Sequence, residues 1–114
     1  MRHENKKVCR IVDELTTWLL QEDTNEIDLK IKKCEDRTLI RLVDYGTHLT
    51  DEDIEEISRT LNCQRQHEVE EYYWQLAGES DCDQELLLLG AMIDAAIVRK
   101  EDGNLILELT RMNE

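Results

Sequence analysis

Residues 27–43 read IDLKIKKCEDRTLIRLV, and this stretch decides the fold. From Ile27 to Ile31 apolar residues alternate with charged ones, which is the period-two pattern of a half-buried strand. Residues 34–37 have the polar composition of a hairpin turn. Residues 38–43 form a second strand that is more apolar, and this predicts a more central place in the sheet.

On both sides of this hairpin the apolar residues follow the 3.6-residue period of helices. Residues 5–21 form the first helix, and charged residues such as Lys7, Asp13 and Glu14 are expected at its solvated positions. The apolar stripe of this helix consists of Val8, Ile11, Val12, Leu15, Trp18 and Leu19. Thr50 and Asp53 form a capping box that opens a second helix with Ile54, Ile57 and Leu61 on one face.

Two further helices and a strand are expected after this point. One helix spans residues 65–77, and Gly78 ends it. The other begins at a capping box of Ser80 and Asp83 and runs through Ile97, with Arg99 and Lys100 complementing its C-terminal dipole. Asp102-Gly103 is a turn, and the alternation in residues 104–111 predicts a third strand.

The resulting order, α-β-β-α-α-α-β, predicts one α+β domain over residues 1–114. We expect a two-layer sandwich in which helices cover one face of a small, mostly antiparallel sheet. A sheet of three strands has at least one open edge, where a second copy of the chain can pair.

The net charge of the chain limits the classes of partner that it can bind. Fourteen Lys and Arg residues stand against 27 Asp and Glu residues, a formal net charge of −13. Such a surface repels nucleic acid and anionic membranes, and it suits a protein partner with a basic face. No apolar run approaches the roughly 18 residues that span a bilayer. Four scattered cysteines and a charged start with no apolar leader predict reduced thiols and a cytoplasmic location.

One short motif carries a family resemblance. Leu42-Val43-Asp44-Tyr45-Gly46 is a strand that runs into a D-x-G step, and with the order of elements it resembles the GHKL superfamily of ATPases. The order of elements resembles especially that of the small anti-sigma-factor serine kinases of this superfamily. The resemblance implies that Asp44 accepts a hydrogen bond from the adenine amino group and that Gly46 lets the backbone turn beneath the base. Gly90 corresponds to the last glycine of the phosphate loop. Without a nucleotide, the same residues make an ordinary turn at Asp44 and a close helix–sheet contact at Gly90.

The sequence departs from that family where ATP and Mg²⁺ bind. His48 replaces the second glycine of the D-x-G motif, and Thr17 or Trp18 stands where the Mg²⁺-binding asparagine belongs. Leucines replace the other phosphate-loop glycines. Four carboxylates that repel a triphosphate precede Gly90, namely Glu79, Asp81, Asp83 and Glu85. ATP and Mg²⁺ are therefore disfavoured as cofactors, and no nucleotide turnover is expected.

Two other features of the sequence are candidate sites. Cys63 and His67 have the spacing of two metal ligands on a helix, but two ligands do not make a zinc site, and no metal is predicted.

Tyr72-Tyr73-Trp74 lies on an acidic helix, and successive positions lie about 100° apart, so the three rings cannot share one core. Tyr72 and Trp74 are either interface residues or packed beneath a neighbouring loop.

Three functions remain open at this point. The first is a regulatory protein-binding module of degenerate histidine-kinase-like ATPase type. The second is an ATP-dependent serine kinase of the anti-sigma type, and the third is a structural or oligomer-forming α+β domain. The missing glycines and asparagine argue against the kinase. The sequence does not distinguish the protein-binding module from the structural or oligomer-forming domain.

Overall fold

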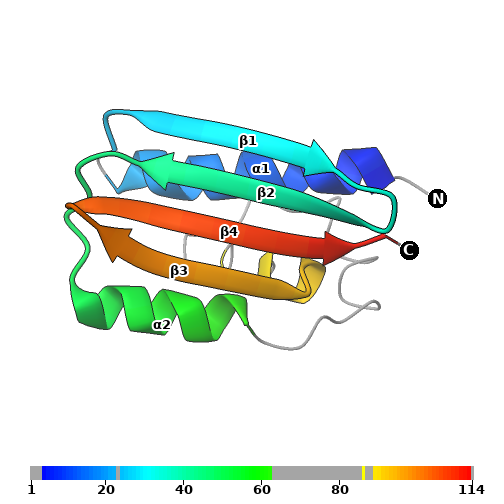
Figure 1. Ribbon diagram of the computed structural model, residues 1–114. Coiled ribbons are helices and arrows are strands. Elements are labelled where there is room, and N and C mark those ends of the chain that lie inside the picture. The colour runs from blue at the N-terminus through cyan, green and yellow to red at the C-terminus, as the bar shows by residue number, and fades with distance from the viewer. Residues whose placement is uncertain (1–3, 23, 63–85, 87–88, 114) are drawn as a thin grey trace.

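The computed structural model describes residues 4–22, 24–62, 86 and 89–113. A short helical segment at residues 89–92 precedes the third strand. The other elements are α1 (Glu4–Gln21), β1 (Ile27–Lys33), β2 (Arg37–Asp44), α2 (Asp51–Leu61), β3 (Ala95–Glu101) and β4 (Asn104–Met112) (Figure 1).

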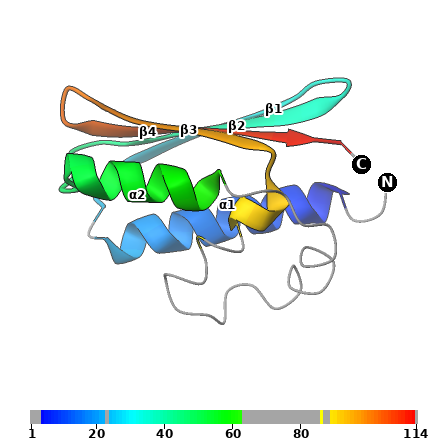
Figure 2. The same cartoon turned by 90° about the horizontal axis from the view of Figure 1, so that it is seen from below.

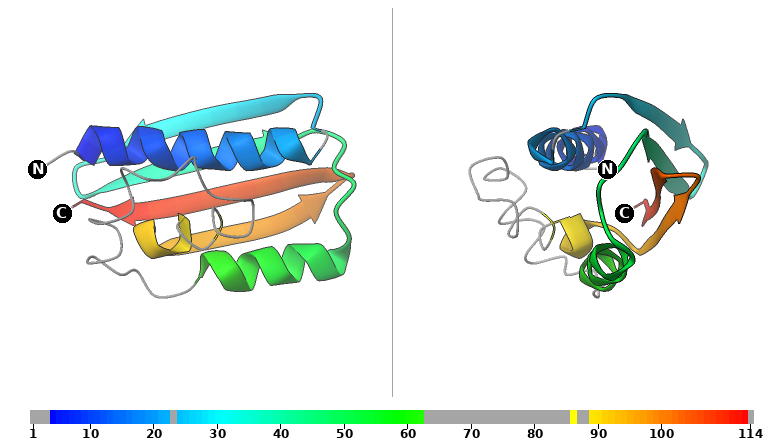
Figure 3. Two further views of the ribbon diagram at one scale, coloured as in Figure 1. Left: turned by 180° about the vertical axis from the view of Figure 1, so that it is seen from behind. Right: turned by 90° about the vertical axis from the view of Figure 1, so that its left-hand side faces the viewer.

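The strands form one antiparallel sheet in the order β1-β2-β4-β3. Both helices and the short helical segment lie on the same face of this sheet, and the opposite face carries no helix in the described part of the chain (Figures 2 and 3). The expected two-layer α+β sandwich and the central place of β2 are confirmed. The sheet has four strands, one more than the sequence predicted.

One hydrophobic core fills the space between the two layers. Ile40 and Leu42 of β2 are buried toward the helices, as are Leu105, Leu107 and Leu109 of β4. From the helical side the core receives Ile11, Leu15 and Leu19 of α1, Ile57 and Leu61 of α2, and Leu89 and Ile93. The apolar stripes predicted for both helices therefore face the sheet.

The helix α2 begins at the predicted capping box. The Thr50 hydroxyl accepts a hydrogen bond from the Asp53 backbone N–H at 3.1 Å, and the Thr50 N–H donates to the Asp53 carboxylate at 3.0 Å. These bonds satisfy N–H groups that the first turn of a helix leaves without partners.

The helix α1 buries three charged residues, and two of them, Lys7 and Glu14, were expected in solvent. Glu4, Lys7 and Glu14 are almost wholly buried, whereas Asp13 is exposed as predicted. Residues 4, 7, 11, 14 and 18 follow the spacing of one helical face, so these charges share the buried face with Ile11 and Trp18. A stripe defined by apolar residues alone was too narrow to include them.

Arg111 of β4 explains part of this burial. Its guanidinium is fully buried, and Nε and Nη2 lie 2.7 and 3.0 Å from the two carboxylate oxygens of Glu4. Nη1 donates to the Met92 carbonyl oxygen at 2.6 Å. One side chain thus joins the start of α1, the end of the helical segment before β3, and β4.

The last predicted helix is wrong beyond residue 92. Residues 95–101 form β3, so Ile97, Arg99 and Lys100 lie on a strand and not at a helix C-terminus. Asp102 and Gly103 both have positive φ, 52° and 78°, as two-residue hairpin turns require. Such a turn needs a strand before it, which pairs with β4. Apolar residues at 92, 93, 96 and 97 fit a helical period, but Ala96 is buried and Ile97 is exposed, as in a strand.

The two edges of the sheet differ. At β3, the Asn62 side chain donates to the Ala96 carbonyl oxygen at 2.8 Å and accepts from the Ala96 N–H at 2.9 Å. At β1, the expected strand forms but is less buried than predicted, because Leu29 and Ile31 remain exposed. The helix α1 packs against β2 and leaves these edge residues uncovered.

Two predictions fall on residues outside the described ones, the helix at 65–77 and the capping box of Ser80 and Asp83. Among the helices that are described, none is long and apolar enough to cross a membrane.

The burial of Trp18 gives a stability prediction. Only 4% of its surface is exposed, in the predicted core with Leu86, Leu89, Met92 and Ile93. Trp18→Ala is expected to lower the free energy of unfolding by roughly 3–5 kcal/mol in urea denaturation. Leu20→Ala, on the same helix but at a side chain that is 62% exposed, is the control and should change it by less than about 0.5 kcal/mol. Equal effects of the two variants would contradict the assigned face of α1.

Candidate functional site

Asp44 ends β2 with its side chain toward the helices. It is 3% exposed, and its Oδ1 atom has no hydrogen-bond partner among the described residues. Burial raises the pKa of Asp44 above its ordinary value of 3.8, although Thr24 and His48 act in the opposite direction. An ionisable group with an unused acceptor is costly to bury, and such groups mark candidate binding positions.

Gly46 completes the D-x-G step and joins the end of β2 to the β3–β4 turn. Its φ is +76°, in the region that favours glycine, and no atom outside the adjacent residues lies within 4 Å of where a Cβ would stand. The Gly46 N–H donates to the Asn104 side chain at 3.0 Å, and the Thr47 N–H donates to the Gly103 carbonyl oxygen at 2.9 Å. The backbone conformation therefore requires glycine here, whether or not a ligand binds.

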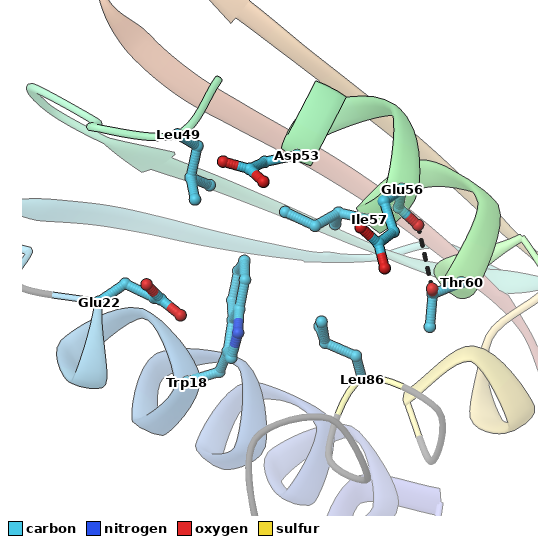
Figure 4. A pocket seen from close by; sticks show the side chains of 8 residues that line it. All are labelled: Trp18, Glu22, Leu49, Asp53, Glu56, Ile57, Thr60 and Leu86. Atoms are coloured by element: carbon cyan, nitrogen blue, oxygen red, sulfur yellow. Dashed lines mark hydrogen bonds between the residues drawn. The ribbon is translucent and has the colours of Figure 1, made fainter. Parts of the chain in front are cut away.

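A hollow of about 380 Å³ lies between α1 and α2 (Figure 4). Trp18 points from α1 toward α2, and Leu86 lies beside it. Among the described residues, the lining consists of Trp18, Glu22, Leu49, Asp53, Glu56, Ile57, Thr60 and Leu86. Asp44 is not among these residues, but the segment that follows it, through Leu49, connects β2 to the rim of the hollow.

The lining of the hollow is apolar at its base and anionic at its rim. Glu22, Asp53 and Glu56 supply three carboxylates, and the part of the lining that the structure describes includes no Lys, Arg or His. Hydrogen bonds from the Thr50 backbone and then from its hydroxyl lower the pKa of Asp53, so this carboxylate stays charged at neutral pH. A phosphate 4 Å from one such charge is repelled by about 1 kcal/mol even in water. A cationic side chain is attracted by the carboxylates.

The structure places the expected nucleotide residues at two different ends of the sheet. Asp44 pairs with Leu105 at the beginning of β4, whereas Ala95, which follows the helical segment containing Gly90, pairs with Thr110 near its end. Gly90 is buried in that segment, which lies between α1 and α2. Asp44 and Gly46 are brought together by the turn, and Gly90 is distant from both along the sheet.

The remaining predicted site residues lie outside the described part of the chain. These are Tyr72 and Trp74, the pair Cys63 and His67, and the carboxylates Glu79, Asp81, Asp83 and Glu85. Within the described residues, no group of three or more His, Cys, Asp or Glu side chains is arranged to hold a metal ion.

Comparisons of the chain with protein-family models, with curated proteins and with solved structures found no match.

Sequence reasoning did not find the hollow. The sequence predicts Trp18 in the core, which is confirmed, and it places Glu22 in a polar break between elements. Only the packing of α1 beside α2 brings Glu22 to the same place as Asp53 and Glu56. The one indication of the hollow in the sequence is the set of acidic residues on the face of α2 opposite its apolar stripe. On their own, such residues indicate a solvated helix surface.

The buried carboxyl of Asp44 predicts a pH-dependent stability. Because its pKa is raised in the folded state, the folded protein holds this proton more tightly than the unfolded chain does. Its contribution to stability is therefore complete below the unfolded pKa and is lost as the pH rises through the folded pKa. Asp44→Asn should be more stable than wild type at pH 7, with a difference that shrinks toward pH 4 in urea unfolding.

The control for this experiment is Glu35→Gln, which removes the same charge from an exposed position in the β1–β2 turn. It should not reproduce the pH-dependent gain. If Asp44→Asn is less stable than wild type at pH 7, the carboxylate has a stabilising partner and its burial is not a net cost.

Proposed function

We propose that this protein is a regulatory protein-binding module of degenerate histidine-kinase-like ATPase type that does not turn over nucleotide. The observation that carries the proposal is the anionic hollow between α1 and α2, where the described lining brings three carboxylates together beside an indole. Such a site attracts the basic side chains of a protein partner and repels phosphates.

The position of Trp18 supports the absence of Mg²⁺ chemistry. In the resemblance to GHKL proteins, Thr17 or Trp18 stands where an asparagine would hold Mg²⁺. Trp18 instead contributes a buried indole to the core and to one wall of the hollow. An indole N–H is only a donor and cannot coordinate a cation. ATP and Mg²⁺ are thus not proposed as cofactors.

The proposed partner is another protein or a second copy of this chain, and the proposed location is the cytoplasm. A net charge of −13 disfavours nucleic acid and anionic lipid as partners. The aromatic pair Tyr72 and Trp74, within an acidic stretch of sequence, is proposed as part of the binding surface.

The first prediction is that millimolar Mg-ATP or ADP leaves the melting temperature unchanged. A ligand that binds only the folded state stabilises it by RT ln(1 + [L]/Kd), so a site that repels phosphate gives no rise. The measurement is a thermal-shift titration against buffer alone. A saturable rise that disappears in Asp44→Asn would replace this proposal with the ATP-dependent serine kinase.

The second prediction concerns Trp74, which the helical period places off the apolar stripe of residues 65–77. Trp74→Ala should keep the wild-type melting temperature and weaken association. Sedimentation velocity measures self-association, and a pull-down from the native lysate measures a second protein. Tyr73→Ala is the contrasting variant, because Tyr73 lies on the apolar stripe and should lower stability instead. A loss of several kcal/mol in Trp74→Ala with unchanged association would assign Trp74 to the core.

A further inference from the structure

The open face of the sheet carries a cluster of cations that the composition does not predict. Lys30 and Lys32 of β1 and Arg41 of β2 are exposed and line a shallow groove on the face opposite the helices, the face turned to the viewer in Figure 1. Among the described residues, none of the three forms an ion pair within 4 Å. In a chain with 27 acidic and 14 basic residues, an unpaired group of three cations is unusual.

The strand register places two of these charges in direct opposition. Lys30 pairs with Arg41 across β1 and β2, and both residues point to the open face. Like charges on directly opposed positions of neighbouring strands destabilise a sheet. A bound carboxylate between the two side chains would relieve that repulsion.

The acidic residues nearby are already engaged. Arg41 also faces Glu108 across β2 and β4, but the Glu108 carboxylate lies 2.5 Å from Nη1 of Arg99. The Asp28 carboxylate accepts a hydrogen bond from the Tyr45 hydroxyl at 2.5 Å. Neither carboxylate forms an ion pair with the cluster, so the groove keeps a local positive charge.

Apolar side chains complete the groove, which has a volume of about 210 Å³. Leu39 lies between the cations and β4, and Ile97 of β3 is 55% exposed at the far side. One row of paired residues crosses the sheet in the order Lys30, Arg41, Glu108 and Ile97. Three strand spacings separate its ends, about 14 Å. An extended peptide covers that distance in about four residues.

We propose that this groove binds an acidic, extended segment of a partner protein. Two carboxylates, two residues apart in the segment so that both point to the sheet, lie over Lys30, Lys32 and Arg41, and a bulky apolar side chain about four residues away packs on Ile97. The proposal rests on the proposed protein-binding function and adds a surface and a partner chemistry to it. Nucleic acid fits less well, because its regular phosphates would also meet Asp28, Glu101 and Glu108. A second copy fits less well because each copy carries the same net charge of −13.

The test is an NMR titration of isotope-labelled protein with a blocked eight-residue peptide. The probe has two glutamates two residues apart and a leucine four residues after the second, with serine and glycine elsewhere, so that all three side chains point to one face of the extended peptide. Saturable shifts are expected at Lys30, Lys32, Leu39, Arg41 and Ile97, with affinity that falls as salt is added. A peptide with glutamine for glutamate, and one with serine for leucine, should each bind more weakly.

Paired variants separate the groove from overall charge. Lys30→Glu/Arg41→Glu should weaken probe binding at least about tenfold. Lys6→Glu/Arg59→Glu, which makes the same charge change at exposed helix positions, should alter it less than about twofold. If the first double variant fails to fold, Lys30→Gln/Arg41→Gln removes the same cations without adding charge and should also weaken binding.

Four outcomes overturn the proposal. They are the absence of saturable shifts at the groove, equal binding by both double variants, tighter binding of a twelve-residue oligothymidylate at the same residues, and self-association that the Lys30→Glu/Arg41→Glu variant abolishes. The last two assign the face to nucleic acid or to a second copy. If the peptide does not bind and Mg-ATP does not bind either, the groove is not the binding surface, but the proposed protein-binding function is unaffected. If Mg-ATP binds, the proposed protein-binding function is overturned, whether or not the peptide binds.

Discussion

The buried guanidinium of Arg111 is the constraint on which the arrangement of elements depends. A cation without solvent must keep its hydrogen-bond partners, because removing one partner of a buried pair costs about 3–5 kcal/mol. Arg111 finds its partners in Glu4 and in the Met92 carbonyl oxygen. It thereby fixes where α1 begins over the sheet and where the helical segment ends before β3. An apolar residue at this position would allow either element to slide.

This anchoring determines the shape of the helical layer. The helix α1 is tied at its first turn to the end of β4, and α2 is tied at its C-terminus to β3 by Asn62. The two helices therefore lie on the same face of the sheet but toward opposite edges, and the hollow with Trp18 lies between them (Figure 3). At the other end of the sheet, the backbone of Gly46 and Thr47 binds the β3–β4 hairpin through Asn104 and Gly103. The D-x-G step is thus a structural junction as well as a candidate ligand position.

The local chemistry of the chain predicted much of this fold. Alternation at residues 27–31, the capping box at Thr50, and the apolar stripe ending at Leu19 each lead to the observed element, because each depends on neighbours in sequence. The strand β3 was missed because Ala96 and Ile97 satisfy both a helical and an alternating period. The turn of Asp102 and Gly103 carried the deciding information. The burial of Lys7 and Glu14 depends on tertiary packing, which the spacing of apolar residues along the helix does not reveal.

The candidate site was harder to predict than the fold. The position of Asp44 at the end of β2 was evident, but its burial without a partner for Oδ1 requires the packed structure. The hollow depends on the separation of two helices, and the opposition of Lys30 and Arg41 depends on the pairing register. A shift of one residue in that register would send one of these side chains to the other face. Sites formed across elements are therefore visible only after assembly.

The carboxamide of Asn62 has a consequence for how the sheet can grow. By binding both the N–H and the carbonyl oxygen of Ala96, it acts as a surrogate peptide group and occupies the place of an incoming strand. The other edge strand, β1, is then the place where another chain can pair through backbone hydrogen bonds. Two copies joined antiparallel through β1 would present only the blocked β3 edges at the outer limits of the combined sheet. Strand addition at β3 is hindered at Ala96, and this limits the open-ended pairing from which fibres grow.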